Sequence, residues 1–360
     1  MKFKQYSLAE LATIKYGKNQ KKVLSANGTF PIYGTGGLMG YATEPLYDKP
    51  SVLIGRKGTI DKVKYVDCPF WTVDTLFYTI INTEIVLPKY LYYVMSQINL
   101  NIYNEGTTIP SLRTETLNRL IFSIPPIEDQ KKILSCVLPF DRKIELNNSI
   151  NKNLEQQAQA IFKAWFIDFE PFSNRKPSDW SVSTLGNVSI MGAGGDKPQN
   201  VSPRKTDLYE YPIYSNGLSN EGLYGFTDNP KVSEESVTVS ARGTIGFVCL
   251  RHIPYVPIVR LVTLIPKTEI ISAKYLYLWL KQLHITGTGT TQQQLTVPDF
   301  QKTEILVPSK EIVTLFTATV EPIFEKIWAN QNENEKLSSL RDTLLPKLLS
   351  GELDVSDIDL

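Results

Sequence analysis

The chain has 360 residues, of which 42% are hydrophobic and 21% are charged, and its formal net charge is +1. This composition excludes an intrinsically disordered chain, and the length is sufficient for two domains or more. No run approaches the roughly 20 apolar residues that a membrane-spanning helix needs, and the N-terminus lacks the apolar core of a signal peptide. We therefore expect a cytoplasmic protein without membrane contact.

Cysteine and histidine are too few to supply much chemistry. Cys68, Cys136 and Cys249 lie far apart in the sequence, which predicts free thiols in a reducing compartment. The two histidines, His252 and His284, leave little material for a zinc site or a His-based catalytic triad. We expect no bound metal ion.

Charge is distributed unevenly along the chain. Residues 1–127 carry 14 Lys and Arg against 9 Asp and Glu, whereas residues 309–360 carry 5 against 10. This asymmetry favours a basic surface that tolerates a polyanion and an acidic tail that avoids one. A basic surface that serves only solubility is the alternative.

The first part of the sequence predicts a mixed α/β domain. The apolar runs at 51–55 and 75–81 are typical of strands, and residues 89–98 are typical of an amphipathic helix. In "GRKGTI" (55–60), two glycines flank a basic pair, so that the backbone and two cations can approach an anion. In "GTTIPSL" (106–112), N–H groups and hydroxyls precede an expected helix or turn and can accept a phosphate. A solvated loop and ordinary helix capping are the alternatives.

A heptad spacing of apolar residues runs from Ile133 to Trp165. Because Pro139 suits the first turn of a helix, we predict a helix from Phe140 to Phe166, about 40 Å long at 1.5 Å per residue. Such a helix would act as a spacer between globular parts. The Pro, Ser and Asn residues of 170–180 then indicate a linker.

The rest of the chain repeats the first part at a separation of about 183 residues. The order of the matching segments is preserved, so the sequence is a tandem duplication. The matching pairs are 30–37 with 211–218, 55–60 with 240–245, 88–95 with 273–280, and 106–112 with 289–295.

The second long helix repeats the first, including its polar core positions. Asn147 and Asn151 correspond to Asn330 and Asn334, and Arg341 alone breaks the apolar pattern. A buried Asn destabilises a helix pair unless it finds a partner, so these residues predict two helices packed antiparallel. Asparagines that face water are the alternative. The residues expected to pack between the helices are Ile144, Asn147, Asn151, Leu154, Ile161, Ile327, Asn330, Asn334, Leu337 and Leu344.

The motifs of common enzymes are missing from the sequence. It contains no phosphate-binding GxxxxGK[ST] loop, no GxSxG elbow and no dinucleotide-binding glycine motif in the required setting. No close pair of carboxylates recurs in both halves. We therefore predict no catalytic residue, and the segments that repeat are binding segments.

Taken together, these segments resemble the specificity (S) subunit of type I restriction-modification systems. The resemblance covers essentially the whole chain and depends on the order of its segments. It is carried by "SLAELATIKYG" (7–17) and "DWSVSTLGNVSIMG" (179–192), by "IPPIEDQKKI" (124–133), by the Gly-Thr-Thr loops and by "RDTLLPKLLSGELDV" (341–355). One departure is "VPSKEIVTLF" (307–316), which lacks the Gln of the first copy.

The resemblance implies an α/β (α+β) tandem duplication, with two globular target-recognition domains joined by two long antiparallel coiled-coil spacer helices. The expected parts are a first target-recognition domain at 1–127, a first spacer helix region at 128–170, a linker at 171–180, a second target-recognition domain at 181–308, a second spacer helix region at 309–352 and an acidic C-terminal tail at 353–360.

The resemblance also implies the function of a non-catalytic subunit that recognises a bipartite, asymmetric sequence in double-stranded DNA. Its expected partners are two copies of a methyltransferase subunit, which uses S-adenosylmethionine, and a restriction subunit, which hydrolyses ATP; the chain itself would hold no cofactor. Two alternatives are a stand-alone DNA-modifying enzyme and a duplicated binding protein for another polymer. The residues expected to contact DNA are Tyr33, Thr35, Arg56, Lys57, Thr59, Thr107, Thr108, Ser111, Arg113, Asn216, Arg242, Thr244, Thr290, Thr291, Gln292 and Gln294.

Overall fold

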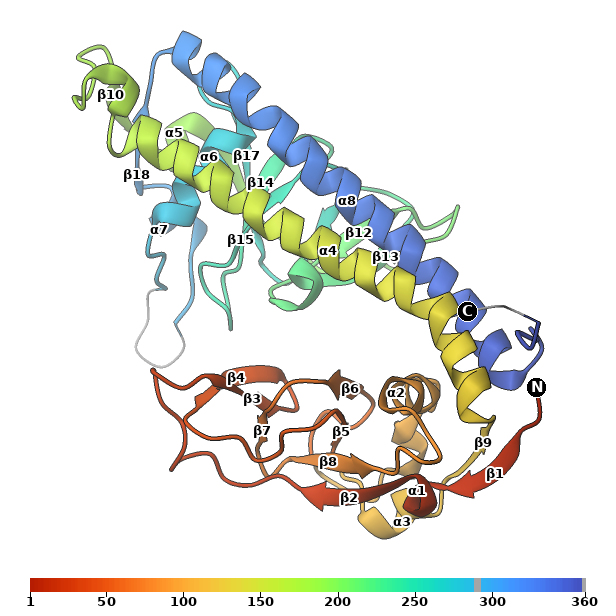
Figure 1. The fold of residues 1–360 in the computed structure, drawn as a ribbon. Coiled ribbons are helices and arrows are strands. Elements are labelled where there is room, and N and C mark those ends of the chain that lie inside the picture. Colours follow the sequence, from red (N-terminus) through yellow and green to blue (C-terminus); the bar gives the residue numbers. More distant parts are fainter. Residues whose placement is uncertain (288–292, 358–360) are drawn as a thin grey trace. The chain divides into compact units, whose positions relative to one another are not determined.

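The computed structural model describes residues 1–287 and 293–357 and divides the chain into two units (Figure 1). Unit 1 consists of Met1–Asn147 together with the chain from Asn332 onward, and unit 2 is Asn148–Gln331. Each unit combines a globular part with one stretch of each of two long helices, α4 (Ile127–Phe166) and α8 (Lys310–Ser350). The predicted duplication of a mixed α/β domain with a long helix is confirmed.

The described residues of unit 1 form three small sheets, with strand orders β2-β8-β5-β6, β4-β3-β7 and β1-β9. Neighbouring strands are antiparallel except β3 and β7, which are parallel. The strands are β1 (Lys4–Ser7), β2 (Ala12–Tyr16), β3 (Phe30–Gly34), β4 (Gly37–Ala42), β5 (Ser51–Gly55), β6 (Val63–Val66), β7 (Trp71–Thr72), β8 (Leu76–Ile81) and β9 (Ile121–Ile124). The shorter helices are α1 (Leu8–Leu11), α2 (Pro88–Ser96), η1 (Leu100–Tyr103) and α3 (Thr114–Asn118).

Unit 2 repeats this plan, with strand orders β11-β17-β14-β15, β13-β12-β16 and β10-β18. Here β12 and β16 form the parallel pair. The strands are β10 (Ser181–Thr184), β11 (Ser189–Ala193), β12 (Tyr211–Tyr214), β13 (Leu223–Thr227), β14 (Ser236–Val239), β15 (Val248–Arg251), β16 (Val256–Pro257), β17 (Val262–Pro266) and β18 (Glu304–Val307). The shorter helices are η2 (Glu170–Phe172), α5 (Leu185–Val188), η3 (Ser219–Gly222), α6 (Ala273–Gln282) and α7 (Val297–Phe300).

The predicted strands and short helices are confirmed because each is an apolar run that the core buries. All five residues of β5 are buried, and its counterpart β14 is likewise buried along its whole length. Tyr90 of α2 and Tyr275 of α6 are fully buried, so the aromatic residues of these helices are core residues.

The predicted start of the first long helix at Phe140 is wrong. Helix α4 begins at Ile127, and Pro139 lies inside it. A proline inside a helix removes one backbone hydrogen bond and costs about 3 kcal/mol. The turns before Pro139 bury Ile133 and Val137 in the core of unit 1, and this packing offsets the loss.

The asparagines of the long helices form pairs within each unit. In unit 1, the Asn147 amide donates to Asn334 at 2.9 Å, and in unit 2 the Asn330 amide donates to Asn151 at 2.7 Å. Asn147 and Asn330 are almost completely buried, which is the setting in which an amide pair fixes the register of two helices. Asn151 also donates to the backbone oxygen of Ile327 at 3.2 Å.

The predicted heptad positions Ile133, Val137 and Ala158 are buried, but at other positions the buried residue lies one place later. Phe162 and Phe166 are the fully buried residues at the end of α4, whereas the predicted Ile161 is only partly buried beside them. In α8, Leu345 is buried and the predicted Leu344 packs at its edge. The remaining predicted positions are half-buried, namely Ile144, Leu154, Ile327 and Leu337. Among the described residues, no helix is long and apolar enough to cross a lipid bilayer.

Candidate nucleic-acid interface

The basic turn of unit 1 lies against the Gly-Thr-Thr loop. The turn follows β5, and the backbone N–H of Leu112 donates to the Arg56 oxygen at 2.9 Å. The N–H of Gly58 donates to the Pro110 oxygen, also at 2.9 Å, and Lys57 pairs with Ser111 in an isolated β-bridge. Two segments that the sequence separates by about 50 residues therefore form one surface.

Glycine is required in this turn. Gly58 has φ +89°, which L-amino acids with side chains rarely adopt. A Cβ on Gly55 would lie 2.1 Å from the Thr59 oxygen, so the chain can close this turn only without a side chain there. The turn holds the basic pair in place without help from a bound ligand.

Arg56 and Lys57 differ in how far they are already engaged. The Arg56 guanidinium donates to the backbone oxygen of Asp74 at 2.9 Å and lies 5.1 Å from the ring centre of Tyr16. Lys57 and the neighbouring Thr59 are exposed. Lys57 is therefore the cation of this turn that is most available to an anion.

Asn104, which the sequence did not single out, organises the Gly-Thr-Thr loop. Its Oδ1 atom accepts hydrogen bonds from the backbone N–H groups of Gly106 and Ser111, both at 2.9 Å. Thr107 and Thr108 are exposed at the tip of the loop that these bonds close. The signal for this residue was the Asn-Glu-Gly sequence (104–106), because an Asn side chain in a turn commonly accepts from the backbone N–H two residues on, here that of Gly106.

Arg113, another predicted DNA contact, is paired with an acid. Its Nε atom lies 3.1 Å from the Glu105 carboxylate, which also accepts a hydrogen bond from Thr116. The side chain of Arg113 is 70% exposed, so a phosphate would compete with Glu105 for an accessible guanidinium.

Unit 2 brings together the equivalent elements. Arg242 donates from Nε and from a terminal nitrogen to Oε1 of Gln294, at 3.0 and 2.7 Å. The backbone N–H of Leu295 donates to the Ala241 oxygen at 3.0 Å. Arg242 is exposed, whereas the Thr244 hydroxyl is buried without a partner in the described part of the unit. The predicted Thr290, Thr291 and Gln292 lie outside the described residues.

The hairpins β3–β4 and β12–β13 lie beside the two basic turns. A Cβ on Gly58 would lie 3.7 Å from the Thr35 hydroxyl, and the Lys64 ammonium is 4.0 Å from the ring centre of Tyr33. In unit 2, Asn216 accepts from the N–H of Ala241 and donates to the Val259 oxygen, both at 2.7 Å. Asn216 thus links its hairpin to the basic turn through its own amide.

Arg251 is a second residue that sequence reasoning missed. It is almost fully buried, and its guanidinium lies 3.6 Å from the ring centre of Tyr214. It donates to the Glu221 carboxylate at 3.0 Å and to the Glu221 backbone oxygen at 2.7 Å. Because Asn220 and Glu221 both have positive φ, Arg251 holds the loop before β13 in a conformation that costs free energy.

The Cys249 thiol and the His252 imidazole both have pKa values shifted toward their uncharged forms. Burial raises the pKa of the Cys249 thiol to about 12, which keeps it protonated. His252 is exposed at one side and stacks on Trp328 at 4.1 Å, and the reduced hydration of its imidazole, with the charges of Lys274 and Arg251, lowers its pKa to about 4. Within the described residues, no group of three or more His, Cys, Asp or Glu is arranged to hold a metal ion.

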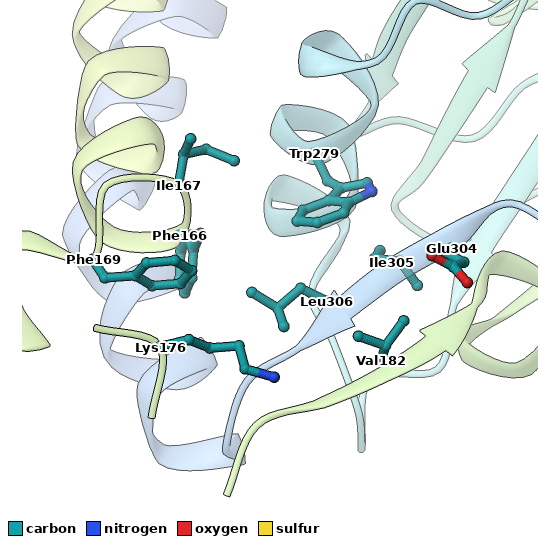
Figure 2. Close-up of a pocket in the computed structure, with 9 residues that line it drawn as sticks. All are labelled: Phe166, Ile167, Phe169, Lys176, Val182, Trp279, Glu304, Ile305 and Leu306. Carbon is teal, nitrogen blue, oxygen red and sulfur yellow. The ribbon is translucent and has the colours of Figure 1, made fainter. Parts of the chain in front are cut away.

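A pocket of about 310 Å³ in unit 2 involves none of the residues expected to contact DNA (Figure 2). It lies between the end of α4, helix α6 and strands β10 and β18. Its lining is mainly apolar and consists of Phe166, Ile167, Phe169, Lys176, Val182, Trp279, Glu304, Ile305 and Leu306.

Comparison with known proteins identifies the family. A family model described as the type I restriction modification DNA specificity domain matches residues 1–156 and 177–338. The HindI specificity subunit of Haemophilus influenzae is 29% identical, with 80% of this chain and 82% of that protein covered. The MjaIX specificity subunit of Methanocaldococcus jannaschii is 27% identical, with coverages of 87% and 80%.

The fold has a solved counterpart in a type I restriction-modification S subunit from M. genitalium. The two structures align with a TM-score of 0.57 at 18% identity and cover 97% and 96% of the respective chains. Both halves of the present sequence match the family model, and both units have the same strand order. The chain belongs to the family of type I restriction-modification specificity subunits.

Proposed function

We propose that this chain selects the DNA target of a type I restriction-modification complex, and that each unit reads one half of a bipartite, asymmetric sequence. The observation that carries the proposal is the repeated surface. In both units, a basic glycine turn is bonded to the segment that follows Gly-Thr-Thr, by Leu112 to Arg56 and by Leu295 to Ala241. A duplicated anion-binding surface suits a polymer that presents two similar patches.

The two surfaces share a backbone plan and differ in their side chains, which suits two different half-sites. Unit 1 presents Lys57 and threonine hydroxyls, whereas unit 2 presents an arginine bonded to Gln294. Cations and hydroxyls position a protein on phosphates, and amide side chains can read base edges, with adenine the favoured match for Gln. The recognised sequence is therefore expected to be asymmetric.

The partners follow from the same proposal. The chain would dock two copies of a methyltransferase subunit, which brings S-adenosylmethionine, and a restriction subunit, which brings ATP hydrolysis. The chain itself would supply specificity without catalysis, in the cytoplasm. Purified chain alone is then expected neither to methylate nor to cut DNA.

The test begins with methylome sequencing of cells that express the chain with its partner subunits. The expected result is one bipartite motif with a nonspecific gap. A duplex carrying that motif then serves for affinity measurements over a salt series with Lys57→Ala and Arg242→Ala. Each variant should weaken binding and reduce the slope of log affinity against log salt by about 0.9 for each phosphate that it no longer neutralises.

Lys302→Ala is the matched control, because Lys302 is 78% exposed and lies in unit 2 outside the repeated surface. It should leave both the affinity and the slope unchanged. Equal slopes for all three variants and the parent chain would refute the assignment of the two basic turns. Cells without a methylated motif, or affinity without salt dependence, would refute DNA recognition itself.

A further inference from the structure

Each unit exposes two consecutive large apolar side chains at the same place in the repeat. Leu38 and Met39 on β4 are 54% and 57% exposed, and Leu223 and Tyr224 on β13 are 36% and 50% exposed. Single exposed apolar residues are ordinary on protein surfaces. An exposed pair that recurs at equivalent positions of two diverged domains indicates a shared use.

The backbone beneath each pair is built in the same way. The pairing of β3 with β4 shifts register between Ile32 and Tyr33, and the pairing of β12 with β13 shifts between Ile213 and Tyr214. Each shift is a β-bulge or a similar irregularity. Such a bulge changes the direction in which neighbouring side chains project. Ile32 and Ile213 are fully buried in small cores, so each exposed pair lies on a hairpin anchored to the rest of its unit.

Basic segments flank the pair in unit 1. On one side, the hairpin lies beside the basic turn, where the Thr35 hydroxyl would be 3.7 Å from a Cβ on Gly58. On the other side, β4 is bonded to the segment that follows the exposed Lys21 and Lys22. The N–H of Ser25 donates to the backbone oxygen of Tyr41 at 3.0 Å. The exposed pair therefore lies on a hairpin that adjoins two basic segments.

The hairpin of unit 2 is tied to its own basic turn. Asn216 accepts a hydrogen bond from the backbone N–H of Ala241, the residue before Arg242. The buried Arg251 stacks on Tyr214, and Tyr214 pairs with Leu223 across the bulge. In both units, the exposed apolar pair thus lies on the hairpin that adjoins a basic turn.

We propose that Leu38 and Met39 in unit 1, and Leu223 and Tyr224 in unit 2, make apolar contact with DNA bases. The proposal rests on the proposed function. Phosphates offer no apolar surface, whereas base faces and the thymine methyl group do. The basic turns would hold the backbone, and the apolar pairs would contribute to the choice of sequence.

The test uses the full chain assembled with its partner subunits and a duplex that carries the methylated motif. The variants are Leu38→Ala/Met39→Ala and Leu223→Ala/Tyr224→Ala. The controls are Ile121→Ala and Ile190→Ala, because these residues are 62% and 64% exposed on β9 and β11. Circular dichroism establishes that every variant is folded before DNA is added.

Each paired variant should bind the motif about ten-fold more weakly, in line with the removal of apolar or stacking interactions with bases. The slope of log affinity against log salt should stay at the parent value, since the cations that neutralise phosphates are unchanged. Affinity for a duplex without the motif should also stay unchanged. The controls should match the parent chain in all three measurements.

Two modified duplexes identify the apolar partner on DNA. Uracil in place of thymine removes the methyl group, and 2-aminopurine fluoresces more brightly when a base is unstacked. Apolar base contact is supported if uracil lowers the affinity of the parent chain and not that of the paired variant. It is also supported if the fluorescence of 2-aminopurine rises with the parent chain and not with the paired variant. The uracil result indicates the methyl group, and the fluorescence result indicates the base face.

Three outcomes would overturn the proposal while DNA recognition by the parent chain stands. They are unchanged affinity of the paired variants for the motif, an equal loss of affinity on both duplexes, and a loss of partner subunits without a loss of DNA affinity. By contrast, a parent complex that does not prefer the motif would refute the proposed function itself.

Discussion

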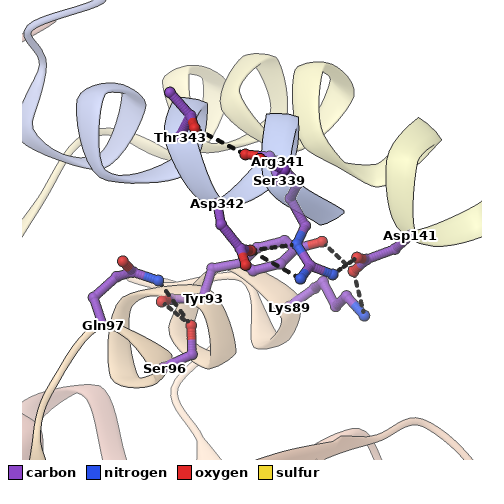
Figure 3. Close-up of polar contacts among 9 residues, drawn as sticks. All are labelled: Lys89, Tyr93, Ser96, Gln97, Asp141, Ser339, Arg341, Asp342 and Thr343. Atoms are coloured by element: carbon purple, nitrogen blue, oxygen red, sulfur yellow. Dashed lines mark hydrogen bonds and ion pairs between the residues drawn. The ribbon is translucent and has the colours of Figure 1, made fainter. Parts of the chain in front are cut away.

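Replacing Arg341 by Ala should destabilise unit 1 through the carboxylate that it leaves behind. Arg341 on α8 donates to Asp141 on α4 at 2.7 Å, and Lys89 on α2 lies 3.5 Å from the same carboxylate (Figure 3). The Tyr93 hydroxyl also donates to Asp141, whose side chain is only 12% exposed. Removal of Arg341 would leave a nearly buried charge with its weaker partners.

The size of the effect follows from the burial of the two side chains. Breaking a fully buried ion pair by removing one partner costs about 3–5 kcal/mol. Arg341 is 26% exposed, and Asp141 would keep the Tyr93 hydrogen bond, so the cost here is smaller. We expect Arg341→Ala to lower the free energy of unfolding of unit 1 by about 2 kcal/mol at pH 7.

The effect should depend on pH in a direction set by Asp141. Burial raises the pKa of Asp141, but hydrogen bonds from Tyr93 and Arg341 and the charges of Lys89 and Arg341 outweigh it, and the pKa lies below its usual value. A carboxyl with a lowered pKa in the folded state stabilises above its unfolded pKa, near 3.9, and loses that contribution as pH falls through the folded value. The difference between the parent chain and Arg341→Ala should be full above about pH 5 and should shrink below pH 4.

Hydrogen exchange read by mass spectrometry measures this effect locally, in peptides from α2 and from the paired stretches of α4 and α8. A cycle with Asp141→Asn, Arg341→Ala and the double variant gives the coupling free energy, expected at about 1–2 kcal/mol. Asp141→Asn removes the charge but keeps the shape, so the double variant should be more stable than Arg341→Ala alone. A coupling near zero at pH 7, or a difference that persists unchanged at pH 3, would refute the reasoning.

Three further predictions concern recognition and its supports. Exchange of residues 1–127 for the equivalent part of a relative should change one half of the methylated motif and leave the other intact; a change in both halves would contradict one reader per unit. Insertion of four residues into both long helices, between the two paired asparagines of each, keeps both amide pairs and adds about 6 Å of helix. The methylated motif should then keep both halves and gain one or two base pairs in its gap, and an unchanged gap would show that the helices do not set it. Asn104→Ala should speed amide exchange at Gly106 and Ser111 by ten-fold or more, because their acceptor is removed, and exchange at the parent rate would show that the loop closes without Asn104.

The sequence predicted the parts whose signals are local and repeated. The run "SVLIG" (51–55) is buried along its whole length, and its repeat forms the equivalent strand in unit 2. The two basic turns and the loops beside them were recognised as a repeated set, since glycine and threonine keep their spacing in both copies. Their direct bonding to each other depends on backbone contacts between segments far apart in the chain.

The features that the sequence did not predict depend on distant partners or on exposure. Arg341 interrupts the heptad because it pairs with Asp141 on the other long helix. This partner lies 200 residues away in the sequence, so the local pattern does not reveal it. Pro139 suggested a helix start, but packing of the preceding turns overrode that preference. The exposed pair of Leu38 and Met39 could not be distinguished from core residues, because apolar strand residues occur on both faces of a small sheet.

The asparagine pairs of the two long helices are symmetric with respect to the repeat. Asn147 corresponds to Asn330 and Asn151 to Asn334, and the observed pairs are Asn147 with Asn334 and Asn151 with Asn330. Two copies of either helix, packed antiparallel, would place the same amides opposite each other. The amide pairs therefore set the register of two antiparallel helices, but they do not distinguish α4 from α8.

The ion pair of unit 1 provides that distinction. The positions equivalent to Asp141 and Arg341 in unit 2 are Phe324 and Ala158, which are both buried in an apolar core. Two copies of α4 would place Asp141 against Ala158 and leave it only Lys89 and Tyr93 as partners, and two copies of α8 would place Arg341 against Phe324 without Asp141, so either pairing weakens the compensation of a largely buried charge. The first half of α4 is thereby matched to the second half of α8, and the same residue that interrupts the apolar repeat specifies which helices pair.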